Sequence, residues 1–175
     1  MYKDYFSSVN NALERLDIVE IEKIVLRLKL ARSNNKRVWI VGNGGSAATA
    51  SHFANDLIKI AGVDATAVHE AIPTVLAFGN DTGWENMYSG LIGEVIEAGD
   101  ILIAISCSGN SMNVVNAASL VGSEDLIVFT GDDVENRLAQ MKPGAIIFVR
   151  DSDIRVQEDV HLVVCHSISG SLKPR

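Results

Sequence analysis

Two pairs of histidine and carboxylate side chains could handle protons or bind a metal ion. His52 and Asp56 are four residues apart in a segment of helical character, so one helix face carries both of them. The C-terminal segment 156–166 contains Glu158 and His166, which lie about 80° apart around a helix at roughly 100° per residue. Histidine changes charge near neutral pH, and imidazoles and carboxylates are both zinc ligands. These residue types predict proton transfer or divalent-metal binding.

His161, in the same C-terminal segment, has a structural interpretation. It follows Gln157 by four residues, a spacing at which two side chains on one helix face can share a hydrogen bond. The residues that we expect to form the core face of this helix are Val156, Val160 and Val163. A structural role is favoured for His161 and a chemical role for His166, and the sequence leaves both open.

Two turns rich in glycine and hydroxyl groups could hold an anion. The first, Gly42 to Ser46, separates the apolar run 38–41 from the helical segment that carries His52. Glycine lets the backbone approach a ligand, and a helix N-terminus offers free N–H groups. The second turn, Ser106 to Ser111, follows the most apolar run, 101–105. Because neither turn has the spacing of a Walker loop or a dinucleotide fingerprint, we predict a phosphate site built from neutral donors.

Composition excludes several classes of protein. The chain has 175 residues, of which 47 % are hydrophobic and 21 % charged, as in a folded globular domain. A net charge of −7 argues against a nucleic-acid surface. No apolar run reaches the roughly 20 residues that span a bilayer, and the polar N-terminal segment does not resemble a signal peptide. We therefore expect a cytoplasmic protein with no membrane or nucleic-acid partner, in which Cys107 and Cys165 are reduced thiols.

Apolar runs alternate with helical patterns along the chain. The runs are 38–41, 65–68, 74–78, 101–105, 126–130 and 145–149. Helical patterns cover about 84–97, a segment from 112, about 134–141 and about 153–169. Apolar strands separated by helices predict an α/β fold with a parallel sheet covered on both faces. Ligands bind beyond the carboxyl ends of the strands in such folds.

Two helices are predicted before the first strand. Their apolar residues at helical spacing are Phe6, Val9, Leu13 and Leu16, then Ile18, Ile21, Val25 and Leu28. Asp17 is placed to cap the second helix. The apolar faces could pack on the domain or form subunit contacts, and the sequence does not decide between these alternatives.

Four motifs in this order resemble those of the sugar isomerase (SIS) domain. They read GNGGSAATASHFANDL, FGND, ISCSGNS and VQEDVHLVVCH, and within the SIS family they are similar to the phosphoheptose isomerases. The resemblance covers nearly the whole chain. It implies a flavodoxin-like three-layer α/β/α fold with about five parallel strands. It further implies that residues 1–175 are a single SIS domain, with a helical extension at 1–34 and an α/β core at 35–175.

The resemblance also implies an activity and a set of site residues. Members of this family convert sedoheptulose 7-phosphate to D-glycero-D-manno-heptose 7-phosphate, an aldose–ketose isomerisation through an enediol(ate). They are homotetramers whose active sites lie at subunit interfaces. The positions that would bind substrate are Asn43, Gly44, Gly45, Ser46, Asn80, Asp81, Ser106, Cys107, Ser108, Asn110, Ser111 and Glu158. Those that would bind zinc are His52, Asp56, Glu158 and His166, with Asp56 as the base and His166 as the acid.

Four positions depart from the usual family residues. Asp56 stands where glutamate is usual, Glu158 where glutamine is, Cys107 where threonine is, and Ile60 where arginine is. These changes leave the identity of the sugar open. One alternative is an isomerase of a different sugar phosphate. Another is a non-catalytic SIS regulator that binds a replication-initiator-type protein, although the histidine and carboxylate residues favour an enzyme.

Overall fold

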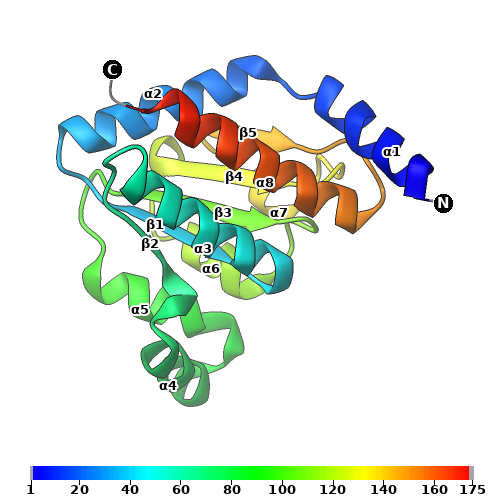
Figure 1. Cartoon of the computed structure of the whole chain (residues 1–175). Coiled ribbons are helices and arrows are strands. Elements are labelled where there is room, and N and C mark those ends of the chain that lie inside the picture. The colour runs from blue at the N-terminus through cyan, green and yellow to red at the C-terminus, as the bar shows by residue number, and fades with distance from the viewer. Residues whose placement is uncertain (1, 174–175) are drawn as a thin grey trace.

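A parallel sheet forms the middle of the molecule (Figure 1). The structure, a computed structural model, describes residues 2–173. Within that range the five strands lie in the order β2-β1-β3-β4-β5, and every neighbouring pair is parallel. They are β1 (Val38–Gly42), β2 (Ala65–Ala67), β3 (Ile101–Ser106), β4 (Leu126–Thr130) and β5 (Ala145–Phe148). This is the flavodoxin-like order, and it confirms the predicted α/β fold.

The central strands bring the two predicted anion turns to one edge of the sheet. Every residue of β1, β3 and β4 is buried, as expected for strands covered on both faces. The register pairs Gly42 with Ile105 and Ser106 with Thr130. The carboxyl ends of β1 and β3 therefore meet at the point where the strand order reverses, which is where ligands bind in these folds.

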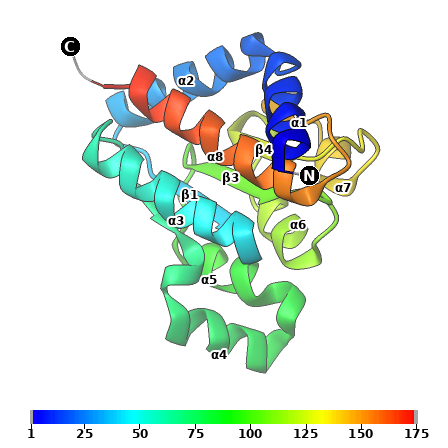
Figure 2. The same ribbon diagram turned by 45° about the vertical axis from the view of Figure 1, so that its right-hand side comes forward.

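Helices pack on both faces of the sheet. One face carries α1 (Tyr2–Glu14), α2 (Ile18–Ser33), α3 (Gly44–Lys59) and α8 (Ile154–Ser171). The other carries α5 (Met87–Val95), α6 (Met112–Ala118) and α7 (Arg137–Gln140). Helices α3 and α8 lie side by side in both views (Figures 1 and 2). Within residues 2–173, no helix has both the length and the apolar character that crossing a bilayer requires.

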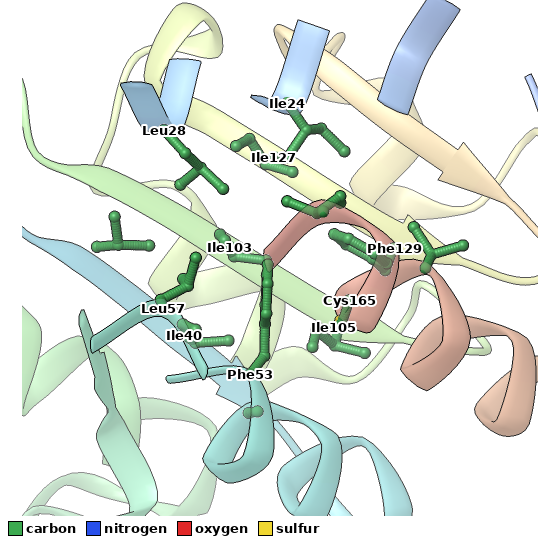
Figure 3. Close-up of a cluster of buried hydrophobic side chains, with 14 of the residues drawn as sticks. Ile24, Leu28, Ile40, Phe53, Leu57, Ile103, Ile105, Ile127, Phe129 and Cys165 are labelled. Atoms are coloured by element: carbon green, nitrogen blue, oxygen red, sulfur yellow. The ribbon is translucent and has the colours of Figure 1, made fainter. Parts of the chain in front are cut away.

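A hydrophobic cluster fixes α2, α3 and α8 on the sheet (Figure 3). The rings of Phe53, on α3, and Phe129, on β4, meet edge to face with centroids 6.4 Å apart. Other buried members are Ile24, Leu28, Ile40, Leu57, Ile103, Ile105, Ile127 and Cys165. Burying a large apolar side chain stabilises the fold by about 1.5–3 kcal/mol, so this cluster holds the two helices that carry the histidines and carboxylates.

The apolar run 74–78 is not a strand. It lies within α4 (Ile72–Thr82), where Pro73 occupies the first turn, a position that suits proline because its missing N–H has no partner there. Only Val75 of this run is buried. Short apolar runs do not by themselves distinguish a strand from a helix. The next helical pattern, 84–97, divides into a 3-10 turn at Trp84–Asn86 and α5, and the pattern 134–141 shortens to α7.

The two leading helices pack largely on the domain. The Asp17 side chain accepts a hydrogen bond from the Val19 N–H at 2.9 Å, which confirms the predicted cap of α2. Leu28 is fully buried, whereas Phe6 and Ile18 are 62 % and 60 % exposed. The other predicted apolar residues, Val9, Leu13, Leu16, Ile21 and Val25, are half-buried against the core. Subunit contact through the exposed residues stays a prediction.

The core face of α8 differs from the predicted one at a single position. Val156 and Val160 are buried as expected, but Val163 is 42 % exposed and Val164 is buried instead. The reason is the helical period of 3.6 residues, which places successive buried residues either three or four positions apart. The step after Val160 is four residues because α8 buries its side facing both α3 and the sheet.

Candidate active site

A small cleft lies where β1 and β3 end. Its volume is about 190 Å³. The residues that line it are Asn43, Ser46, Ile105, Ser106, Cys107, Ser108, Ser111, Ile154 and Glu158. Seven of the twelve predicted substrate positions are in this set. Helix α3 begins at Gly44, beside the cleft, so its first free N–H groups lie near the hydroxyl groups.

Three serine hydroxyls converge in the cleft. The Oγ of Ser106 is 3.4 Å from that of Ser108 and 3.5 Å from that of Ser111. Gly109, with φ of +62°, turns the chain between them in a conformation that a residue with a Cβ rarely adopts. Such a ring of neutral donors can surround the oxygens of a phosphate.

Glu158 is the only charged side chain among the described residues that line the cleft. Its carboxylate lies against Gly45, where a Cβ atom would collide with it. Burial raises the pKa of Cys107 to about 11, and the charge of Glu158 adds to the shift. Cys107 therefore stays a protonated thiol at neutral pH, which is a weak hydrogen-bond donor.

A second group of polar side chains lies further along α3 and α8. The Nε2 atoms of His52 and His166 are 2.9 Å apart. Asp56 Oδ2 is 3.6 Å from His52 Nε2 and 3.9 Å from His166 Nε2. The Asp56 side chain is nearly buried, whereas those of the two histidines are 50 % exposed, so the group is open to solvent on one side.

These three residues suit a divalent metal ion. Their ligand atoms all lie within 4.8 Å of one another. Tetrahedral zinc ligands about 2.0–2.1 Å from the ion lie about 3.3 Å from each other, and the separations of 2.9, 3.6 and 3.9 Å between these three ligand atoms lie on both sides of that value. Two histidine nitrogens and a carboxylate oxygen are also the donor types that zinc takes in catalytic sites. The geometry therefore fits three of the four predicted ligands.

Glu158 does not join this group within one chain. It precedes His166 by eight positions (158 against 166) on one continuous helix, which separates the two Cα atoms by about 12 Å at 1.5 Å per residue. Glu158 instead faces the cleft of serine hydroxyls. Of the four predicted metal ligands, His52, Asp56 and His166 therefore lie close together, and Glu158 lies apart from them.

The remaining predicted substrate residues lie outside the cleft lining. Gly44 and Gly45 are exposed at the start of α3, beside the cleft. The exposed Asn110 braces the loop, since its side chain donates to the Ser108 carbonyl at 2.9 Å and accepts from the Arg137 N–H at 3.0 Å.

The predicted pair Asn80 and Asp81 lies in the last part of α4, exposed and away from the cleft lining. The Asn80 amide donates to the Asp81 carboxylate at 2.8 Å. Helices α4 and α5 extend below the rest of the molecule in both views (Figures 1 and 2). In the single chain this pair is therefore not brought together with the other predicted substrate residues.

His161 is structural, with a partner other than the expected one. It is fully buried, and its Nε2 lies 3.1 Å from the carbonyl oxygen of Thr130, to which it donates. Burial lowers the pKa of His161 to about 4, so it is neutral at neutral pH. The predicted bond to Gln157 is absent from the described residues, because the Gln157 amide donates to the Asp151 carbonyl at 2.6 Å.

Two residues of the site were not predicted. Asn113 is fully buried behind the cleft, and Tyr88 donates to the Gly42 carbonyl at 2.8 Å. The signal for Asn113 was its polar side chain in the otherwise apolar start of the segment after Ser111. Tyr88 carried no signal, since a tyrosine in an apolar helix is ordinarily a packing residue.

Comparison with known proteins places the chain in a family. The family model of the SIS domain matches residues 2–130. The phosphoheptose isomerase of Sulfurimonas denitrificans is 34 % identical over 158 residues, which cover 86 % of this chain and 78 % of that protein. The phosphoheptose isomerase of Shewanella denitrificans is 30 % identical over 97 % of this chain and 92 % of its own length.

Solved structures agree with the sequence matches. The phosphoheptose isomerase of Neisseria gonorrhoeae superposes with a TM-score of 0.89 at 26 % identity, over 98 % of this chain and 95 % of that one. The Francisella tularensis phosphoheptose isomerase shares the fold with a TM-score of 0.88 at 20 % identity. The motifs, the fold and the relatives all agree, and the chain therefore belongs to the SIS domain family, among its phosphoheptose isomerases.

Proposed function

We propose that this protein interconverts sedoheptulose 7-phosphate and D-glycero-D-manno-heptose 7-phosphate. The observation that carries the proposal is the convergence of His52, Asp56 and His166 on two helices that also border a cleft of serine hydroxyls. The cleft suits the phosphate, and the three-residue group suits the carbonyl end of the sugar. The relatives that bear the name phosphoheptose isomerase support the choice of a heptose.

Asp56 is the proposed base. Ketose–aldose exchange removes a proton from the carbon beside the carbonyl and returns it to the neighbouring carbon. The Asp56 carboxylate is held in place, since it accepts from the Asn55 amide at 3.3 Å and from the Ser169 hydroxyl at 3.5 Å. A carboxylate with fixed orientation can carry the proton between the two carbons.

His166 is the proposed acid, which exchanges a proton with the substrate oxygens. Zinc held by His52, Asp56 and His166 would polarise the carbonyl and stabilise the negative charge of the enediolate. The Nε2 atom of His166 cannot bind an ion and donate a proton at the same time, so these two roles of His166 are alternatives. Measuring activity after metal removal distinguishes the role of His166 as a metal ligand from its role as an acid.

We further propose that the active protein is a homotetramer with sites shared between subunits. The Cα atoms of Glu158 and His166 lie about 12 Å apart along one helix, and Glu158 is not among the residues whose ligand atoms gather with His166. We infer that Glu158 completes the metal group of a neighbouring subunit. An apolar groove of about 460 Å³ between α2 and α8 supports this arrangement, since it adjoins His166 at Ser167. Helix α2 supplies much of this surface through residues between Ile18 and Lys29, including the exposed Leu26. Sedimentation velocity should therefore report four subunits, and a monomer at micromolar concentration would contradict the proposal.

The two cysteine thiols bear on where in the cell the protein resides. Cys107 and Cys165 are free, with Cys165 fully buried. Burial raises the pKa of Cys165, with the nearby Asp56 charge adding to the shift, so this thiol is not reactive. Free thiols are usual in reducing compartments, and we propose that the protein is cytoplasmic.

Turnover of sedoheptulose 7-phosphate by the purified protein tests the function. We expect aldose formation that a chelator stops and that added zinc restores. Activity that persists after thorough metal removal would keep the isomerase and assign His166 to proton transfer. A folded, zinc-loaded protein without turnover would exclude the heptose and direct the search first to other sugar phosphates and then to a binding role.

A further inference from the structure

A pair of asparagine side chains joins the two turns of the cleft from behind. The Asn43 amide nitrogen donates to Asn113 Oδ1 at 2.9 Å, and the Asn113 amide nitrogen donates to Asn43 Oδ1 at 2.8 Å. Asn43 belongs to the turn after β1, whereas Asn113 lies in the first turn of α6, directly after the serine loop. The two amides thus form a closed, reciprocal pair between segments 70 residues apart in the chain.

The surroundings leave this pair little freedom. Asn113 is fully buried, and its Oδ1 also accepts from the Val114 N–H at 3.0 Å. The Tyr88 hydroxyl lies 3.3 Å from Asn43 Oδ1 while it donates to the Gly42 carbonyl. The oxygen of Asn43 accepts one hydrogen bond from the Asn113 amide, and because one Asn43 amide hydrogen goes to Asn113, at most one is left for a ligand.

We propose that Asn113 is a positioning residue that sets the distance between the first turn and the serine loop, with Asn43 as its partner. The inference rests on the proposed phosphate-binding function of the cleft. A phosphate held by both turns is sensitive to their separation, because hydrogen bonds weaken steeply outside a narrow range of distance and angle. Asn113 is not among the residues that line the cleft, and it lies on a different helix from Asp56 and His166.

The pair predicts a loss of phosphate affinity without a loss of chemistry. In Asn113→Asp the side chain keeps its size but loses the N–H that Asn43 Oδ1 accepts, which leaves two acceptors facing each other. We expect KM for the sugar phosphate to rise about tenfold or more, as for a buried group left without its partner. The value of kcat should stay within about twofold, since the groups that move protons are unchanged.

Inorganic phosphate serves as a probe that needs no turnover. Calorimetry should show phosphate binding to Asn113→Asp weakened by the same factor as KM, even if the natural sugar proves to be another one. If Asn113→Asp fails to fold because Asn113 is buried, Asn43→Ala tests the same pair through its half-exposed partner. The effects of Asn43→Ala and Asn113→Ala should not add in the double variant, because either change alone breaks the pair.

Asn116→Ala is the matched control. Asn116 lies three residues further on α6, but its amide donates to the Glu85 carbonyl at 2.9 Å and not to either turn. Its KM and phosphate affinity should equal those of the unchanged protein. Additive effects in the double variant would overturn the proposal. So would a fall in kcat at constant KM, or phosphate binding that does not change in Asn113→Asp and Asn43→Ala.

Discussion

Asp56→Asn and His166→Ala should each lower kcat by about a thousandfold, because general acid–base catalysis contributes about 10²–10⁴ to such rates. Asparagine keeps the shape of Asp56 but cannot take a proton. Alanine removes the imidazole of His166, and with it both the proton that it would donate and the nitrogen that would bind the metal. Steady-state kinetics with sedoheptulose 7-phosphate would measure the loss, and an unchanged melting temperature would show that the fold survives.

Asp64→Asn provides the control for these variants. This variant makes the same substitution, aspartate to asparagine, at an exposed position just before β2. The Asp64 carboxylate pairs there with Arg37 at 3.0 Å. Turnover should be unaffected there. Near-normal activity in Asp56→Asn or in His166→Ala would remove that residue from the proposed mechanism.

Glu158→Gln should strengthen binding of the sugar phosphate and lower KM about tenfold to a hundredfold. Two like charges roughly 6 Å apart in an effective dielectric near 20 repel by about 3 kcal/mol, and partial exposure of Glu158 reduces this value. Glutamine keeps the shape of the side chain against Gly45 and removes the charge. Initial-rate measurements over a range of substrate concentrations would give KM directly.

The same variant separates the two roles of Glu158. If the carboxylate also binds the metal of a neighbouring subunit, Glu158→Gln should raise the zinc concentration needed for half-maximal activity. Asp159→Asn removes an equal charge at the next position, where the carboxylate accepts from the Tyr5 hydroxyl at 2.7 Å, outside the cleft. KM should not change in this control. A KM that is also unchanged in Glu158→Gln would mean that the phosphate lies elsewhere.

Local sequence determined much of the architecture. Apolar runs that alternate with helical patterns require buried parallel strands, and the structure confirms the five-stranded sheet within residues 2–173. The cap at Asp17 is also a local feature, since it needs only a carboxylate beside the next N–H groups. The same holds for His52 and Asp56, because four-residue spacing on a helix is sufficient to bring them together.

Tertiary packing decided the rest. The run 74–78 is apolar enough for either a strand or a helix. In the fold it belongs to helix α4, which packs against α5 and not into the sheet. His166 meets His52 because α8 packs on α3, whereas Glu158, on the same helix, is directed to the cleft by the rise of about 12 Å between them. The pairing of Asn43 with Asn113 also depends on the fold. Hydrogen bonds between segments 70 residues apart leave no periodic pattern in a sequence, because only the assembled sheet brings their ends together.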